Sequence, residues 1–175
     1  MSNARILANT INSSSQIVVP SGGVNFGTDT DGTGTVTGGI LDDYEEGTWT
    51  PVVADSASGG TAGTCSVPYA IYTKIGREVT VYGYVSAVNT TGMTSGSSFH
   101  IRGLPFSASE RGVGNFYTYK VGRDAATVSS CAMVLSQHMR FFLFTTNKAT
   151  TDKSILVSDI TSGSSEFIFT VSYYI

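Results

Sequence analysis

The chain has 175 residues and a net charge of −3, and 13% of its residues are charged, against roughly 25% in an average soluble domain. Nine Phe and nine Tyr exclude the aromatic-poor, highly charged composition of disordered chains. Lys and Arg are scattered singly, so we expect no nucleic-acid partner. No apolar run approaches the ~20 residues of a membrane helix, so we expect no membrane partner. These numbers indicate one folded domain with an appendage and a neutral, polar surface.

Residues 1–40 contain too few large apolar side chains to build a core of their own. We interpret them as an extended attachment arm and collar that is ordered by packing on a partner. The first residues lack the long apolar core of a signal peptide, so we expect the chain to be made and matured in a cytoplasm. The candidate anchoring residues are the apolar side chains spaced along this arm: Ile6, Leu7, Ile11, Ile17, Val18, Val19, Val24 and Phe26.

From residue 41 onward the sequence pattern becomes that of β-strands. Residues 79–85 alternate so that Val79, Val81 and Val85 share one face, and residues 167–175 alternate in the same way. Clusters of Gly, Ser, Asn and Asp separate further predicted strands at 67–73, 98–102, 115–122, 126–136, 140–146 and 154–158. The sequence therefore predicts an all-β fold, an antiparallel β-sandwich or jelly roll over residues 41–175.

The most distinctive segment is residues 41–51, with the sequence Leu-Asp-Asp-Tyr-Glu-Glu-Gly-Thr-Trp-Thr-Pro. It resembles a segment that recurs in bacteriophage tail-fibre and related virion appendage proteins. Residues 72–83, 101–106 and 173–175 are similar to the same family, and residues 21–26 are similar to the glycine-led collar that often precedes the acidic segment. The resemblance extends from about residue 21 to residue 175 and is patchy between 107 and 153.

The resemblance implies a homotrimeric β domain that is attached to a virion by its N-terminal arm. The partners of residues 1–40 would then be capsid or tail proteins. In this family such modules usually end a far longer fibre, whereas here the module begins about 40 residues into the chain. This difference favours a short fibre, a knob or a head decoration.

Several residues are of types that catalyse reactions or bind metals, but we expect no catalytic residue, no metal, no cofactor and no enzyme activity. We expect Tyr44 and Trp49 to bracket a turn that bears the acids of residues 42–46. These acids are candidates for a glycosidase pair or a cation site, but adjacent acids on a turn are usually solvated. Residues 29–34 are similar to the start of a calcium loop but lack its closing Glu. Cys65 and Cys131 have no activating His nearby in sequence, and free thiols are favoured over a disulfide.

Histidine and aromatic residues mark the remaining candidates. His100 alternates with two apolar neighbours, so we expect it to be exposed beside Arg102 in a structural role; the alternative is three copies gathered at a trimer axis. Because Phe141 and Phe142 are adjacent, they must face opposite sides of a strand, one in the core and the other covered by a second sheet or a neighbouring subunit. The aromatic residues of 116–119 could likewise lie in the core and at a subunit interface, or Tyr117 and Tyr119 could be exposed and stack on a host glycan.

Two functions therefore remain open. The chain is either a structural virion appendage, displayed as a trimer, or a receptor-binding adhesin that recognises a host surface glycan or protein. The candidate receptor contacts are Tyr117 and Tyr119, which would stack on a sugar. The polar loops predicted at 54–66 and 86–97 offer few aromatic residues to hold a sugar, so the structural role is favoured.

Overall fold

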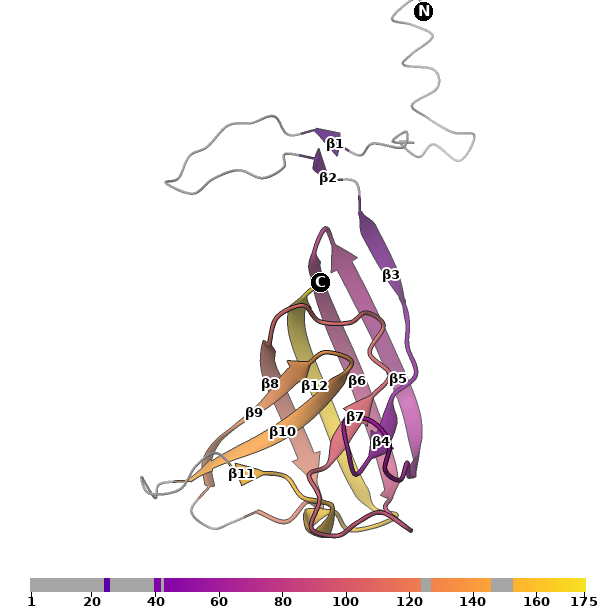
Figure 1. Ribbon diagram of the computed structural model, residues 1–175, viewed down its shortest axis with the longest axis vertical. Coiled ribbons are helices and arrows are strands. Elements are labelled where there is room, and N and C mark those ends of the chain that lie inside the picture. Colours follow the sequence, from indigo (N-terminus) through magenta and orange to yellow (C-terminus); the bar gives the residue numbers. More distant parts are fainter. Residues whose placement is uncertain (1–23, 26–39, 42, 124–126, 146–152) are drawn as a thin grey trace, which may run out of the picture. The chain divides into compact units, whose positions relative to one another are not determined.

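The computed structural model describes residues 24–25, 40–41, 43–123, 127–145 and 153–175 (Figure 1). The chain divides into two units, Met1–Tyr44 and Glu45–Ile175, with a boundary four residues after the one predicted. In the first unit, β1 (Val24–Asn25) pairs antiparallel with β2 (Ile40–Leu41). The other candidate anchors lie outside the described residues; these are Ile6, Leu7, Ile11, Ile17, Val18, Val19 and Phe26.

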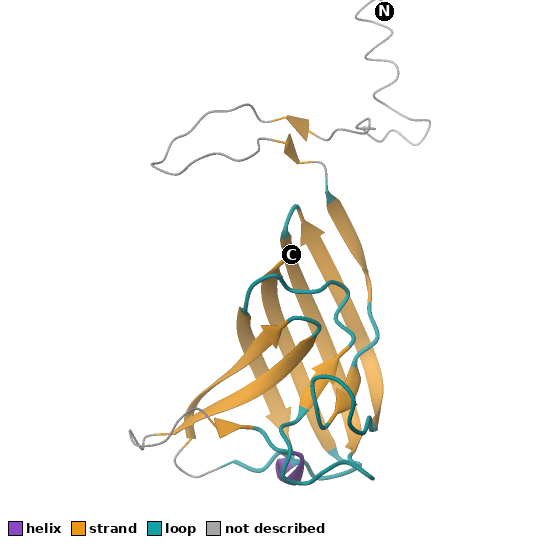
Figure 2. Cartoon of the chain, viewed as in Figure 1, coloured by secondary structure: helices purple, strands orange, loops and turns teal. Residues whose placement is uncertain are grey.

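The rest of the described chain forms a curled antiparallel sheet of ten strands, which confirms the all-β prediction (Figure 2). The strand order is β3-β5-β6-β12-β8-β9-β10-β7-β4, and β11 pairs with β10. The strands are β3 (Tyr44–Thr48), β4 (Val52–Ala54), β5 (Thr64–Ile75), β6 (Glu78–Asn89), β7 (His100–Arg102), β8 (Gly112–Tyr119), β9 (Thr127–Leu135), β10 (His138–Thr145), β11 (Lys153–Ser154) and β12 (Ser165–Tyr174).

The sheet curls so that its two ends approach each other. In Figure 1, β4 and β7 cross in front of β5 and β6. The amide of Gly63 donates to the carbonyl of Val53 at 2.9 Å, and Ala54 forms an antiparallel bridge with Ala62. These bonds tie β4 to the segment that enters β5. One side of the curled sheet is therefore enclosed, and its side chains form a core between two layers.

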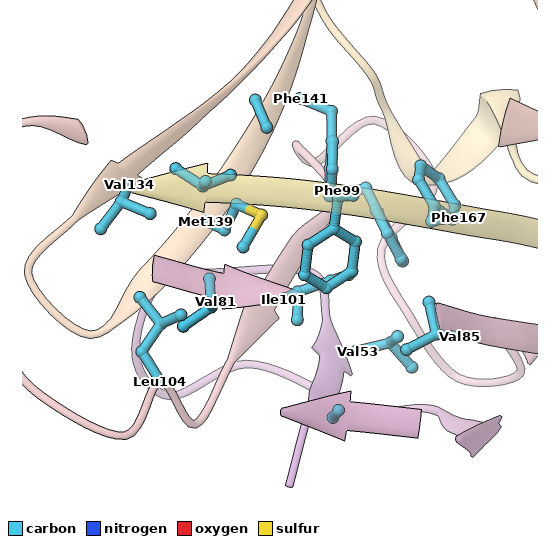
Figure 3. Close-up of a cluster of buried hydrophobic side chains, with 14 of the residues drawn as sticks. Val53, Val81, Val85, Phe99, Ile101, Leu104, Val134, Met139, Phe141 and Phe167 are labelled. Atoms are coloured by element: carbon cyan, nitrogen blue, oxygen red, sulfur yellow. The ribbon is translucent and has the colours of Figure 1, made fainter. Parts of the chain in front are cut away.

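The core is built from the alternating positions that the sequence predicts. Val79, Val81 and Val85 are fully buried, and on β12 the odd-numbered residues from Phe167 to Tyr173 are at most 1% exposed. Facing strands complete the cluster, which includes Val53, Ile101, Val134 and Met139 (Figure 3).

Aromatic rings form the centre of this core. Phe167 stacks on Phe99 with ring centroids 4.9 Å apart and contacts Phe141 at the same distance (Figure 3). Phe116 meets Phe141 edge to face, also at 4.9 Å. Such pairs contribute about 0.5–1.5 kcal/mol each beyond the burial of their area. These rings come from β8, β10, β12 and the residue just before β7, segments that are far apart in the sequence.

Two predictions of local structure are wrong. Residues 44–48 form strand β3 and not a turn, and Trp49, directly after it, is buried with its ring edge-on to Phe169. The strand predicted at 154–158 ends at Ser154. A short 3-10 helix, η1 (Val157–Asp159), follows it, and the carboxylate of Asp159 accepts a hydrogen bond from the amide of Leu156 at 2.9 Å. This local side-chain bond competes with strand pairing.

Candidate functional site

The register of four strands places a row of apolar side chains on the face opposite the core. Tyr69 of β5 lies opposite Tyr84 of β6, which lies opposite Ile168 of β12, which in turn lies opposite Tyr117 of β8. Because alternate residues of a strand point to opposite faces, burial of Val85 on β6 directs Tyr84 outward. The consecutive strands β5 and β6 and the more distant strands β8 and β12 therefore contribute to one row of large apolar side chains.

A second row lies beside the first. It contains Ile71, Tyr82, Thr170 and Asn115, again on β5, β6, β12 and β8. We call the two rows, with the exposed residues at their margins, the tyrosine face. It consists of Tyr69, Ile71, Tyr82, Tyr84, Val113, Asn115, Tyr117, Tyr119, Ile168 and Thr170.

The tyrosine face is exposed although it is rich in large apolar groups. Tyr69, Ile71, Tyr82, Tyr117 and Tyr119 are between 37% and 56% exposed. Single exposed apolar residues are normal on a protein surface, but a contiguous patch of them is typical of an interaction site. The face is suited to burying apolar area against another surface, with hydroxyl and amide groups available for hydrogen bonds.

Little charge accompanies these residues. Glu166, the outward-facing acid of β12, lies opposite Tyr119 and accepts a hydrogen bond from the Tyr84 hydroxyl at 3.0 Å. This hydrogen bond raises the pKa of Tyr84. The Nζ atom of Lys120 lies 5.4 Å from the centre of the Tyr119 ring. Glu166 and Lys120 thus lie beside Tyr84 and Tyr119, Glu78 lies towards the opposite end of the same side of the sheet, and the two rows themselves contain no charged residue.

A shallow depression of about 240 Å³ lies within the tyrosine face. It is lined by Tyr82, Asn115, Phe116, Tyr117, Ile168, Phe169 and Thr170. Pockets that enclose small molecules usually measure about 300–1,000 Å³, so this depression is too small to enclose one. It can accept an apolar side chain or one face of a sugar ring.

The structure places Tyr117 and Tyr119 on the outer side of the sheet. Both lie on the tyrosine face and are exposed, whereas their neighbour Phe116 turns inward to the core. Sequence reasoning missed Tyr69 and Tyr82, whose relation to Tyr117 depends on pairing between strands. The alternation of β6 with buried valines was the signal that Tyr82 points outward.

The expectation that His100 is exposed is wrong. It lies on the opposite face from Ile101, as predicted, but it is 7% exposed. Strand β7 is flanked by β4 and β10, and the His100 ring lies against the His138 ring with centroids 5.0 Å apart. Burial, together with the charges of His138, Arg140 and Arg102, lowers the pKa of His100 to about 4.

The other sequence candidates do not come together as a site. Glu45 and Glu46 are exposed on β3, and the Glu45 carboxylate accepts a hydrogen bond from the Tyr72 hydroxyl at 2.6 Å. Residues 29–34 and residue 42 lie outside the described residues. Among the residues that the structure describes, no three His, Cys, Asp or Glu side chains are grouped to hold a metal. Cys65 and Cys131 are half-buried thiols that are not joined in a disulfide, and burial raises the pKa of Cys65.

Comparison with known proteins adds no relative. The chain matches no protein-family model, no curated protein and no solved structure. Over its described ranges, the chain contains no helix that is long and apolar enough to span a membrane.

Proposed function

We propose that the chain is a structural protein of a bacteriophage virion, a short trimeric fibre, knob or decoration that residues 1–40 hold on the particle. The observation that carries this proposal is the tyrosine face. A neutral sheet surface with several half-exposed Tyr and Ile side chains lies on a domain that already has a complete core. Such a surface is unfavourable in water and favours association with identical copies.

A trimer would cover the tyrosine face without leaving an open end. Three copies around a threefold axis would each turn one sheet inward, like the walls of a triangular prism. Burial of each half-exposed Tyr or Ile would contribute about 1 kcal/mol. Closed symmetry also explains how an association surface avoids forming fibres.

The residues that carry the resemblance to virion appendage proteins support a structural role. Trp49, Val81, Ile101, Leu104 and Tyr173 come from four of the similar segments, and all are buried in the core. They specify a β domain rather than a reaction.

The second candidate function is a receptor-binding adhesin. The observation that favours it is the exposure of Tyr117 and Tyr119, with Tyr117 lining the depression beside Asn115 and Thr170. A Tyr ring can stack on a sugar while an amide and a hydroxyl bind its hydroxyl groups. The depression is shallow, so we rank this function below the structural one.

Electron microscopy of intact particles tests the proposal. Particles of a phage that encodes the chain would be labelled with a gold-conjugated antibody raised against residues 45–175. The proposal expects label at fixed positions on the capsid or tail. A chain that is abundant in infected cells but absent from purified particles would contradict it.

A further inference from the structure

A second feature lies on β7 and β10, outside the tyrosine face. In their antiparallel register, His138 lies opposite Arg102 and Arg140 lies opposite His100. These four residues point away from the core, because Ile101 and Met139 between them are fully buried. The register thus builds a two-by-two group of basic side chains, which we call the basic array.

The flanking strands bring no acid to the basic array. On β4, Val52 lies opposite Arg102 and Ala54 lies opposite His100. On β9, Leu135 lies opposite His138 and Met133 lies opposite Arg140. Cross-strand neighbours, the closest side chains in a sheet, are therefore all apolar.

Several nitrogen atoms of the array are buried without an acceptor. They are Nδ1 of His100, Nε and Nη2 of Arg102, and Nε of Arg140. His100 is more than nine-tenths buried, whereas Arg102, His138 and Arg140 are half-buried, so solvent reaches the array from their side. Buried donors in native proteins nearly always have a partner, and an unpaired buried charge is strongly unfavourable.

The acceptors that are present are neutral or already used. Nη2 of Arg140 donates to the hydroxyl of Ser98 at 3.0 Å and to that of Ser154, and its guanidinium lies 5.1 Å from the centre of the Phe142 ring. Asp55 acts electrostatically on His100, but its two carboxylate oxygens accept hydrogen bonds from the amides of Thr61 and Thr94. The two guanidinium groups therefore lack a dedicated counter-charge among the described residues.

We infer that the basic array is a binding site for an oxyanion, held by Arg102 and Arg140 with the two imidazoles beside them. Planar guanidinium groups bind carboxylate and phosphate oxygens through paired hydrogen bonds. The ligand is either a free phosphate-like ion or the carboxylate of an acidic sugar. This inference rests on the array alone and is independent of the proposed role in a virion.

Binding to the full chain tests the inference. Thermal unfolding would be followed at constant ionic strength while inorganic phosphate, glucuronate or glucose is added, and the ring signals of His100 and His138 would be followed by NMR. A ligand that binds the native state raises the unfolding temperature in a saturable way. We expect phosphate, glucuronate or both to do so and to shift both His signals, and glucose to do neither. The more effective anion identifies the source of the oxyanion.

Variants locate the site. Arg102→Gln and Arg140→Gln should each weaken binding by about tenfold or more, because a charged hydrogen bond is lost. Arg77→Gln and Arg111→Gln remove the same charge from exposed positions and should bind as the wild type does. The inference is overturned if neither anion shifts the His signals of the wild type, or if the exposed-site variants lose binding equally. The wild-type NMR result decides the question even if an array variant does not fold.

Discussion

The rings of Tyr69 on β5 and Tyr82 on β6 stack across the outer surface of the sheet, with centroids 5.7 Å apart and planes inclined by 23°. Tyr69 lies directly opposite Tyr84, so its contact with Tyr82 is diagonal, and its ring also lies 5.7 Å from that of Tyr84. Side chains that already support one another lose little conformational freedom when a partner covers them. The proposed association through the tyrosine face would therefore cost little side-chain freedom at these rings.

Charge placed on the tyrosine face should prevent self-association. We expect Tyr82→Lys and Tyr117→Lys to convert the proposed trimer to monomers without loss of fold, because both side chains are exposed and three like charges would meet at the axis. Sedimentation velocity measures the oligomer, and circular dichroism checks the sheet. Thr91→Lys adds the same charge to an exposed loop and should remain trimeric. Trimers of the two face variants would argue against this surface.

Gly83 should be intolerant of even one added methyl group. A Cβ atom there would lie 2.4 Å from the ring of Phe169, which is fixed in the core. We expect Gly83→Ala to lower the free energy of unfolding by about 1–3 kcal/mol, as overpacked cores do. Gly96→Ala is the matched control, because no atom lies within 4 Å of its added Cβ. Denaturant unfolding gives the free energy of unfolding of both variants. Equal values would contradict the prediction, because Phe169 could then move to make room for the added methyl group.

The burial of His100 predicts a loss of stability in mild acid. Burial first, then His138, Arg140 and Arg102, lower its pKa from 6.5 to about 4, while Asp55 partly opposes them. Since the folded pKa lies below the unfolded one, protonation favours the unfolded chain. The native state is therefore fully stable with respect to this group above pH 6.5, where His100 is neutral in both states. Its free energy of unfolding falls as the pH falls towards 4.

The expected loss is on the order of 1–3 kcal/mol of unfolding free energy across that range. Denaturant titrations at a series of pH values measure it. His100→Gln should reduce the change of unfolding free energy with pH. Burial also lowers the pKa of His138, which should account for part of the change that remains. If His100→Gln left the pH dependence of the unfolding free energy unchanged, groups other than His100 would be responsible for the loss of stability in acid.

Removal of residues 1–26 should separate attachment from folding. The unit Glu45–Ile175 holds the whole of the described core, so we expect the shortened chain to form the proposed trimer and to have the same unfolding temperature as the full chain. It should no longer enter virions, because the candidate anchors Ile6 to Val24 and Phe26 are removed. Copy number in purified particles, measured by quantitative mass spectrometry, checks this. Normal incorporation would show that the arm is not the anchor.

The sequence predicted those features that depend on local alternation. Burial of Val79, Val81 and Val85 followed from the period of two in β6. Strand β3 was missed because its exposed Tyr44, Glu45 and Glu46 resemble a solvated turn more than a strand.

The tyrosine face and the basic array were beyond prediction for a different reason. Each depends on register between segments that are distant in sequence, such as Tyr84 with Ile168, or His138 with Arg102. Alternation gives the side on which a residue lies but not its neighbour on the next strand. His100 was expected to be exposed because its sequence neighbours do not reveal that β4 and β10 flank it.

The mass of the full chain in solution tests the central claim most directly. Light scattering on the wild-type protein at micromolar concentration should give about three times the chain mass of 18.4 kDa. A mass of 18.4 kDa would contradict the account, because the tyrosine face would then remain in water in the free protein.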